Sequence, residues 1–548
     1  MPHTDLPAAV PGAAPASPRH EKLNTRAASV VALAVLGSRI LGLVRDQIFG
    51  TLFGGGEVMD AFIMAFRIPN LLRDLFAEGA LSTAFITVFT KTTALEGDRA
   101  AWQLANKVAT AAAVLVSFLT LLGILGAPWI VAVLAHGFPP AKAALTVMLT
   151  RIMFPFILLV SLAALVMGML NARNVFGIPA TASSFFNLGS IIAGAGIGWA
   201  IDPHFGPRAT VGLAIGTLIG GAMQLAVQLP SLKRQGYHFR PDFHWRDKGV
   251  KAILQLMGPS VIAASSTQVN VLVNSVFASE LGNGPVTWLQ YSFRLMQLPL
   301  GIFGVALGTV SLPLLARMAA GGNMPGFRTE LARGMRLAFL LTIPASIGLI
   351  LLAVPIMSVL FQHGRFTARD AFEAAAALRF YAVGLCGYAA LKVLVNAFYA
   401  VDRRHTPMFV SFAAVGLNLL LNWLFTFRLG WGHEGLAFST ACIATTNFIV
   451  LYVLMHRHLG RLESRAMLSL LLRLSVACAV LGGICWAGDH YLLAGWASER
   501  FWPKAGSLAA VIVVGAGAFL CCATALRIRE MQDIAVAVQR RLRRAARP

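Results

Sequence analysis

Four arginines stand inside apolar stretches of this sequence, and no polar flank explains them. They are Arg39, Arg45, Arg73 and Arg294. A charged side chain at the centre of a membrane-spanning helix costs about 2.5–3.5 kcal/mol on insertion scales, so such residues usually face a cavity. The planar guanidinium fork suits phosphate oxygens. Several arginines that converge on one water-filled cavity would bind an anionic, phosphorylated substrate, and we assign these four that role.

Helical spacing groups some of these residues on common faces. Ser38, Gly42 and Arg45 follow one another at i, i+4 and i+7, which places them on one small, polar stripe of a helix. Arg39 and Asp46 are also seven residues apart, so we predict that they share another face of the same helix and form an ion pair.

Further polar residues are expected to complete the cavity. Asn70, Arg73 and Asp74 lie within one helical turn, and Glu78 follows Asp74 by four residues. The acids would moderate the positive field of the arginines; in the alternative interpretation they only keep the arginines paired. The residues that we predict to support the cavity are Ser38, Asp46, Asp60 and Asn70.

The four arginines belong to a larger group of basic residues within or near apolar segments. Some of these residues are close enough to a segment end for their charged heads to reach the membrane surface. We expect this behaviour of Lys107, Arg151, Arg379 and Arg473. The remaining two members of the group are Arg67 and Lys392.

Patterns typical of enzymes and metal sites are missing from the sequence. It contains no HExxH, G-x-S-x-G or Walker A run, and its six cysteines lie in apolar runs without CxxC spacing. Gly54, Gly55 and Gly56 look like a tight turn and not like a phosphate-binding loop. We therefore expect no enzymatic activity, no metal and no cofactor, and any transport must draw on the membrane potential or an ion gradient.

The composition shows which elements must position these residues. Hydrophobic residues make up 57% of the 548 residues and charged residues only 12%, whereas soluble domains carry about 25% charged residues. A water-soluble globule is therefore excluded, and we predict an all-α polytopic membrane protein. Its fourteen expected spans cover about residues 27–52, 57–90, 102–135, 141–172, 179–201, 208–232, 250–279, 285–317, 327–361, 370–401, 406–428, 434–456, 466–495 and 502–526.

Basic residues predict the orientation of these spans. With the N-terminus inside, the inner loops receive about four times as many Lys and Arg as the outer loops, as the positive-inside rule requires. Most of the net charge of +22 is then a topology signal, and nucleic-acid binding loses its support. We expect both termini in the cytoplasm.

An internal repeat divides the chain. Phe66-Arg67-Ile68-Pro69 and the run to Lys91 resemble Phe293-Arg294-Leu295-Met296 and the run to Arg317. Six spans separate the copies, so the two halves have the same orientation and suggest two parallel six-helix bundles. The predicted organisation is a disordered cytoplasmic tail (1–22), an N-lobe of helices 1–6 (23–235), a C-lobe of helices 7–12 (236–460), helices 13–14 (461–530) and a basic cytoplasmic tail (531–548).

Several motifs together resemble the MurJ/MviN lipid II flippase family. The residues that carry the resemblance are 38–46 (SRILGLVRD), 60–62 (DAF), 67–73 (RIPNLLR), 76–80 (FAEGA), 301–313 (GIFGVALGTVSLP), 361–366 (FQHGRF) and 402–407. The resemblance implies a member of the multidrug/oligosaccharidyl-lipid/polysaccharide exporter superfamily, with two six-helix lobes around a central cavity and two extra helices that form a lipid-tail groove. It also implies that the family's cavity arginines correspond to Arg39, Arg45, Arg73 and Arg294, and that Asp60 occupies a recurrent polar position.

The same resemblance implies a substrate and a location. Lipid II, an undecaprenyl-pyrophosphate-linked precursor, would move from the inner to the outer leaflet of the bacterial cytoplasmic membrane for cell wall biosynthesis, in contact with membrane lipids and with other cell wall synthesis proteins. Phe293 and Gln297 flank Arg294 where relatives are expected to carry acidic or polar company. Some members bind sodium in the second lobe, and the candidates for an ion site here are Asn270, Asn396 and Asp402.

Two other functions remain open at this stage. The first is export of another lipid-linked oligosaccharide or a drug on the same fold, although a drug antiporter for cationic cargo would favour acids over arginines in its cavity. The second is a membrane scaffold or receptor without transport, which would require partner motifs in the tails or loops, and only a short basic tail is present.

Overall fold

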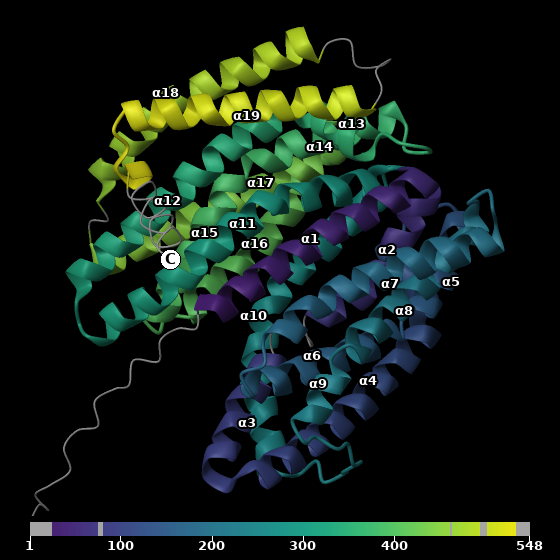
Figure 1. The fold of residues 1–548 in the computed structure, drawn as a ribbon. Helices are drawn as coiled ribbons and strands as arrows, with labels where there is room; N and C mark the ends of the chain where they lie inside the picture. Colours follow the sequence, from purple (N-terminus) through teal and green to yellow (C-terminus); the bar gives the residue numbers. More distant parts are fainter. Residues whose placement is uncertain (1–24, 75–80, 461–462, 494–500, 533–548) are drawn as a thin grey trace, which may run out of the picture.

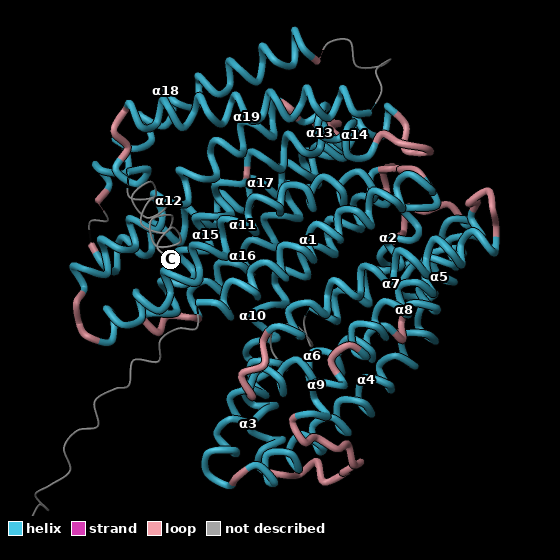
Figure 2. Tube along the Cα trace, viewed as in Figure 1, coloured by secondary structure: helices cyan, strands magenta, loops and turns pink. Residues whose placement is uncertain are grey.

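A computed structural model of the chain describes residues 25–74, 81–460, 463–493 and 501–532. Within these residues the secondary structure consists of helices joined by turns and loops, with no strand (Figure 2). The predicted all-α class is therefore confirmed. The expected disordered tail 1–22, Glu78 and most of the basic tail lie outside the described residues.

The helices follow one another along the chain in two halves. The first half contains α1 (Thr25–Phe53), α2 (Glu57–Leu72), α3 (Ser82–Glu96), α4 (Asp98–Leu134), α5 (Pro140–Met153), α6 (Phe156–Ala172), α7 (Gly177–Ile201), the 3-10 turn η2 (Pro207–Ala209), α8 (Thr210–Ala226) and α9 (Leu229–Arg234). The second half contains α10 (Lys248–Ser279), α11 (Pro285–Ala320), α12 (Met324–Leu351), α13 (Ala353–Phe361), α14 (Ala368–Val383), α15 (Leu385–Ala400), α16 (His405–Trp423), the π-helical turn η3 (Leu424–Arg428) and α17 (Gly432–Leu459). The chain then continues through α18 (Ser464–Ala487), η4 (Gly488–Leu492) and α19 (Phe501–Ala525).

The two halves form two helical bundles, with α1, α2 and α10 close to the boundary between them (Figure 1). Helices α18 and α19 lie side by side along the outside of the second bundle, where α18 packs on α12. Two acids anchor this pair: Arg336 of α12 forms ion pairs with Glu463, 2.7 Å away, and with Glu530. These contacts attach the pair to the second bundle.

Glycine permits the closest helix packing in the first bundle. A Cβ built on Gly212 of α8 would lie 2.2 Å from the backbone nitrogen of Gly198 in α7, and one on Gly216 would lie 2.5 Å from Gly194. No side chain fits in that space, so the two helices approach each other backbone to backbone. Small residues at helix interfaces are the usual means of tight association in membranes.

Length and composition of the described helices support many membrane spans but do not confirm the predicted number of fourteen. Among the described residues, nine helices are long and apolar enough to cross a membrane, or ten if α14 and α15, bent by 42°, form one span. The expected segments that are helical but not among them belong to α1, α2 with α3, α10 and α11. α1, α2, α10 and α11 carry polar residues that line internal cavities. These polar residues lower the mean hydropathy of the four helices.

One set of contacts between the bundles lies at one end of the molecule. The backbone N–H of Arg365 donates to the carbonyl of Thr51 at 2.9 Å, and its guanidinium donates to the carbonyls of Phe205, at 2.6 Å, and His204. Gly54, with a φ of +80°, makes the turn after α1, and a Cβ there would lie 2.9 Å from the carbonyl oxygen of Arg365. The expectation that this glycine run forms a tight turn is confirmed.

A second set of contacts joins the bundles at the same end. His136 Nδ1 lies 3.0 Å from a carboxylate oxygen of Glu280, and the backbone N–H of Gly137 donates to the hydroxyl of Ser279 at 3.4 Å. Toward the opposite end the bundles diverge (Figure 1). The sealed end, as we name it below, consists of residues 50–56, 135–142, 204–206, 279–287 and 362–370.

The segment that links the bundles, residues 235–247, is held against α4. Asn106 accepts a hydrogen bond from the backbone N–H of Arg240 at 3.2 Å, and Thr110 accepts one from that of Asp242 at 3.0 Å. Lys107 donates to Asp247 at 2.7 Å, and this hydrogen bond holds the pKa of the Asp247 carboxyl below its usual range. Lys107 therefore pairs with an acid at the end of its segment.

Candidate functional site

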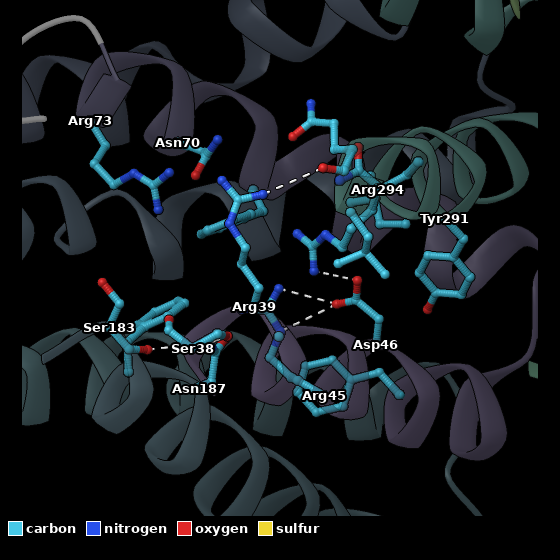
Figure 3. A pocket seen from close by; sticks show the side chains of 18 of the residues that line it. Ser38, Arg39, Arg45, Asp46, Asn70, Arg73, Ser183, Asn187, Tyr291 and Arg294 are labelled. Atoms are coloured by element: carbon cyan, nitrogen blue, oxygen red, sulfur yellow. Dashed lines mark hydrogen bonds and ion pairs between the residues drawn. The ribbon is translucent and has the colours of Figure 1, made fainter. Parts of the chain in front are cut away.

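The four arginines selected from the sequence line one cavity of about 490 Å³ between the two bundles. Arg39 and Arg45 come from α1, Arg73 from the C-terminal end of α2, and Arg294 from α11 (Figure 3). Ser38, Asp46 and Asn70 also line it, as expected. The structure thus brings together residues from both halves of the chain.

Asp46 lies at the centre of this cavity and connects the bundles. Its Oδ1 accepts hydrogen bonds from Arg45 at 3.1 Å and 3.4 Å, and its Oδ2 accepts one from Nη1 of Arg294 (Figure 3). Asp46 is 5% exposed. Arg294 therefore has the acidic company that its own sequence neighbours lack, and this acid comes from the opposite bundle.

The predicted ion pair between Arg39 and Asp46 is wrong. Nη1 of Arg39 instead donates to the carbonyl of Gln297 in α11 at 3.4 Å. The guanidinium rests against Gly301, where a Cβ would lie 1.8 Å from Nη1. Seven residues of helix separate the backbones of Arg39 and Asp46 by about 10 Å. α11 supplies nearer partners, the carbonyl of Gln297 for Arg39 and the guanidinium of Arg294 for Asp46.

The polar stripe on α1 faces α7. Asn187 donates to the carbonyl of Ser38 at 3.1 Å, and its amide lies 3.6 Å from a Cβ built on Gly42. The guanidinium of Arg45 lies over the ring of Phe186 at 5.5 Å. The stripe therefore fixes α1 on α7 and holds Arg45 at the cavity wall.

Arg73 belongs to a further local pair at the end of α2. Its Nη2 lies 2.9 Å from Oδ1 of Asp74, and Gln268 of α10 donates to the other oxygen of that carboxylate at 3.4 Å. Asp74 thus also joins α2 to the second bundle.

Sequence reasoning assigned no role to Arg67, which also lines the cavity. Its Nε is buried and has no hydrogen-bond partner among the described residues, so it is a donor that a ligand oxygen could satisfy. The signal was present in the internal repeat, in which Phe66-Arg67 corresponds to Phe293-Arg294.

Asp60 does not line the cavity, contrary to expectation. It is fully buried at the sealed end, where Lys142 donates to its Oδ2 at 2.9 Å. The backbone N–H groups of Gly284 and Thr287, at 2.7 and 2.9 Å, and the Thr287 hydroxyl, at 2.6 Å, also donate to this carboxylate. Asp60 lies in the first turn of α2, and its hydrogen bonds to Gly284 and Thr287 cap the N-terminus of α11 from the other bundle.

The three candidates for an ion site do not come together. Asn270 and Asn396 line different cavities, and Asp402, after the end of α15, has a side chain that is 89% exposed and lies 3.8 Å from Arg404. The three residues lie on different elements, and the packing of these elements leaves them on separate surfaces. No group of three or more His, Cys, Asp or Glu within the described residues could hold a metal ion.

Asn270 instead belongs to a hydrogen-bonded cluster of amides beside a cavity of about 210 Å³. Asn418 of α16 donates to Asn270 at 3.0 Å and to Asn274 at 3.1 Å, and Asn422 donates to Asn274 at 2.7 Å. Asn274 in turn donates to Thr440 of α17 at 3.0 Å. Sequence reasoning missed the cluster, although Asn418 and Asn422, like Asn270 and Asn274, share a helix face at i and i+4.

The charge of the central cavity determines what it can bind. Among the described residues that line it are five arginines and one carboxylate, so it is strongly cationic. Guanidinium groups offer paired donors that match phosphate oxygens. The arrangement suits an anion with several oxygens, held between the two bundles.

Known proteins are similar to this chain in sequence and in fold. The sequence model of the family described as "Lipid II flippase MurJ" matches residues 49–504. The chain is 35% identical over 520 residues to the probable lipid II flippase MurJ of Vibrio cholerae, which covers 93% of this chain and 97% of the relative. It is 34% identical to the lipid II flippase MurJ of Burkholderia cenocepacia, over 90% of this chain and 96% of the relative.

Solved structures agree at the level of the fold. A structure described as lipid II flippase MurJ in an inward closed conformation matches with a TM-score of 0.74 at 24% identity, over 90% of this chain and 98% of that chain. An inward-facing multidrug resistance MATE family transporter of the MOP superfamily matches with a TM-score of 0.66 at 15% identity, over 80% and 99%.

Proposed function

The chain belongs to the lipid II flippase MurJ family, and on that premise we propose that it carries lipid II from the inner to the outer leaflet of the membrane by alternating access. It is a multi-pass protein of the bacterial inner membrane and a member of a transporter family. Its work is to move the precursor without chemical change, so we assign it no enzymatic activity.

The central cavity is the observation that carries the proposal. A pyrophosphate that crosses a membrane needs charge compensation throughout, because a bare anion in hydrocarbon is strongly disfavoured. The guanidinium groups of Arg45 and Arg294 already meet at one carboxylate, that of Asp46, so their positions suit an anion that contacts both bundles. A pyrophosphate in this cavity would compete with Asp46 for the same donors.

The sealed end suggests the state in the transport cycle. If the inner loops are those rich in Lys and Arg, the sealed end is the outer one, and the cavity takes its substrate from the cytoplasmic side. Transport then requires the contacts of Asp60 and Arg365 to break while the bundles close at the inner end. Arginines contributed by both bundles allow the substrate to favour that rearrangement.

The energy source is the membrane potential or an ion gradient. Lipid II carries negative charge, and an inside-negative potential helps an anion to move outward by about 2.3 kcal/mol per charge per 100 mV. The alternative substrates, another lipid-linked oligosaccharide or a drug, rest on the related MATE fold alone. The cationic cavity argues against a cationic drug.

A depletion strain tests the proposal. Cells that lack their own lipid II flippase and express this chain should grow and keep little lipid II on the inner leaflet, measured by its accessibility to an externally added lipid II-modifying enzyme. Cells that express the Arg45→Ala variant should accumulate lipid II inside. Accumulation in both strains, at equal protein levels in the membrane, would reject lipid II as the substrate.

A further inference from the structure

A second cationic cavity adjoins the central one on the side of the second bundle. It has a volume of about 540 Å³, within the range of about 300–1,000 Å³ that is typical of ligand sites. It is lined mainly by α11, α15 and α16, and its two basic residues are Arg39 and Lys392. No Asp or Glu is among the described residues that line it.

Lys392 is an unusual lysine for its position. It lies eight residues before the end of α15, about 12 Å along the helix. Within the part of the chain that the structure describes, it has no hydrogen-bond or ion-pair partner, and its side chain is exposed. Lys107 and Lys142, by contrast, each pair with a carboxylate. An unpaired ammonium at this depth is expected only where it faces water or a ligand.

Arg39 connects the two cavities. It lines both of them, as does Gln297, whose carbonyl accepts the hydrogen bond from the arginine. Gly301 provides the space for the guanidinium. A ligand held by the arginines of the central cavity can therefore extend past Arg39 toward Lys392.

The walls around Lys392 suit a polar group that is attached to the anion. Tyr388, Asn396 and Ser411 line the cavity and offer hydroxyl and amide groups, while Met296 and Leu300 line it with apolar side chains. Hydroxyl, amide and ammonium groups beside apolar surface are a combination that can hold a peptide with free carboxylates. Lys392 supplies a compact charge and not the bidentate fork that favours phosphate.

We propose that Lys392 and Arg39 form a second anion site, which binds a carboxylate of the peptide carried by the lipid-linked precursor while the pyrophosphate occupies the central cavity. This inference rests on the proposed function, because it assigns a further part of the same substrate. Lys392 is then a specificity-determining residue that distinguishes the peptide-bearing precursor from the bare lipid pyrophosphate.

Equilibrium binding to the full-length protein in nanodiscs tests the inference. The three probes are lipid II, lipid II with its peptide carboxylates converted to carboxamides, and undecaprenyl pyrophosphate. Lys392→Met should weaken binding of lipid II about tenfold, the loss of one charged hydrogen bond of about 1.5 kcal/mol. It should leave undecaprenyl pyrophosphate and the amidated probe unchanged, and Lys392→Arg should restore most of the affinity for lipid II.

Two control variants separate this inference from the proposed function. Lys251→Met removes an exposed lysine of α10 and should change none of the three affinities. Arg45→Ala should weaken the binding of all three probes. Equal weakening of lipid II and undecaprenyl pyrophosphate by Lys392→Met, or no weakening at all, would overturn the second site while leaving the flippase function intact. If the unmodified protein binds lipid II no better than phosphatidylglycerol, the proposed function and this inference both fail.

Discussion

At the scale of single residues, Asp46 is the carboxylate that joins arginines of the two bundles in the central cavity. It neutralises part of the charge of Arg45 and Arg294 and holds them within reach of each other. The two arginines come from different bundles, so an anion that replaced the carboxylate would contact both bundles at once. Under the proposed function, Asp46 would act as an internal substitute for the negative charge of the substrate.

We expect Arg45→Ala, Arg73→Ala and Arg294→Ala each to abolish complementation of a flippase-depleted strain, while the protein still inserts normally. Each variant would lose one charged hydrogen bond to the pyrophosphate, which is worth about 1.5–3 kcal/mol. Lysine replacements should rescue only partially, since lysine binds phosphate as a point charge. Arg39→Ala should also impair function. Unchanged growth and lipid II translocation with alanine at all three positions would reject the pyrophosphate site.

At the scale of helices, the N-terminus of α11 depends on an acid from α2. Asp60 accepts hydrogen bonds from two backbone N–H groups, one in the α10–α11 turn and one in the first turn of α11, and it forms a fully buried ion pair with Lys142. Anions are favourable at helix N-termini. The first bundle therefore holds the second at the sealed end through a buried, fully paired charge.

Asp60→Ala should weaken the sealed end strongly, because breaking a buried ion pair costs about 3–5 kcal/mol. We expect loss of complementation together with increased labelling, from outside the cell, of a cysteine placed at Val286, which is 1% exposed in the sealed end. Asp98→Ala is the matched control: Asp98 is 65% exposed and pairs with Arg173, and an exposed pair contributes at most about 1 kcal/mol. An Asp60→Ala variant that functions and labels like the control would show that the sealed end does not depend on this pair.

The attachment of α18 and α19 gives a prediction about the C-terminus. Arg336 is held by Glu463 and Glu530, and these contacts precede residue 539. Deletion of residues 539–548 should therefore leave complementation nearly intact. Glu530→Ala should lower the thermal midpoint of the purified protein, because it removes a partly buried charged hydrogen bond of about 1.5–3 kcal/mol. Complete loss of function after the short deletion would contradict this assignment.

At the scale of the whole molecule, the orientation of the bundles decides which leaflet the cavity serves. The distribution of Lys and Arg predicts that the segment 233–251 and both termini lie in the cytoplasm. A cysteine introduced in that segment should resist a membrane-impermeant reagent in intact cells and react in inverted vesicles. Efficient labelling in intact cells would reverse the orientation and place the sealed end inside.

The energy source for the proposed transport also concerns the whole molecule in its membrane. Collapse of the membrane potential should stop lipid II translocation while lipid II synthesis continues, because each negative charge that moves outward gains about 2.3 kcal/mol per 100 mV. The measurement is the accessibility of lipid II at the outer face before and after the collapse. Continued translocation without a potential, abolished by removal of sodium, would assign the drive to an ion gradient.

The sequence by itself determined the helical class, the membrane environment and the four arginines that line the central cavity. These inferences depend on local properties, namely long apolar runs and charges placed inside them, which survive in any packing of the helices. The motifs around Arg45 and Arg73 also indicated the family from the sequence alone.

Only the tertiary structure decided which side chains meet. It paired Asp46 with Arg294 in place of Arg39, buried Asp60 beside α11, added Arg67 to the cavity and separated Asn270 from Asp402. Spacing along one helix determines which residues share a face, but it does not determine which distant helix packs on that face. Partner choice across the two bundles follows from the packing of α1 and α2 against α11, and no repeat or motif contains that information.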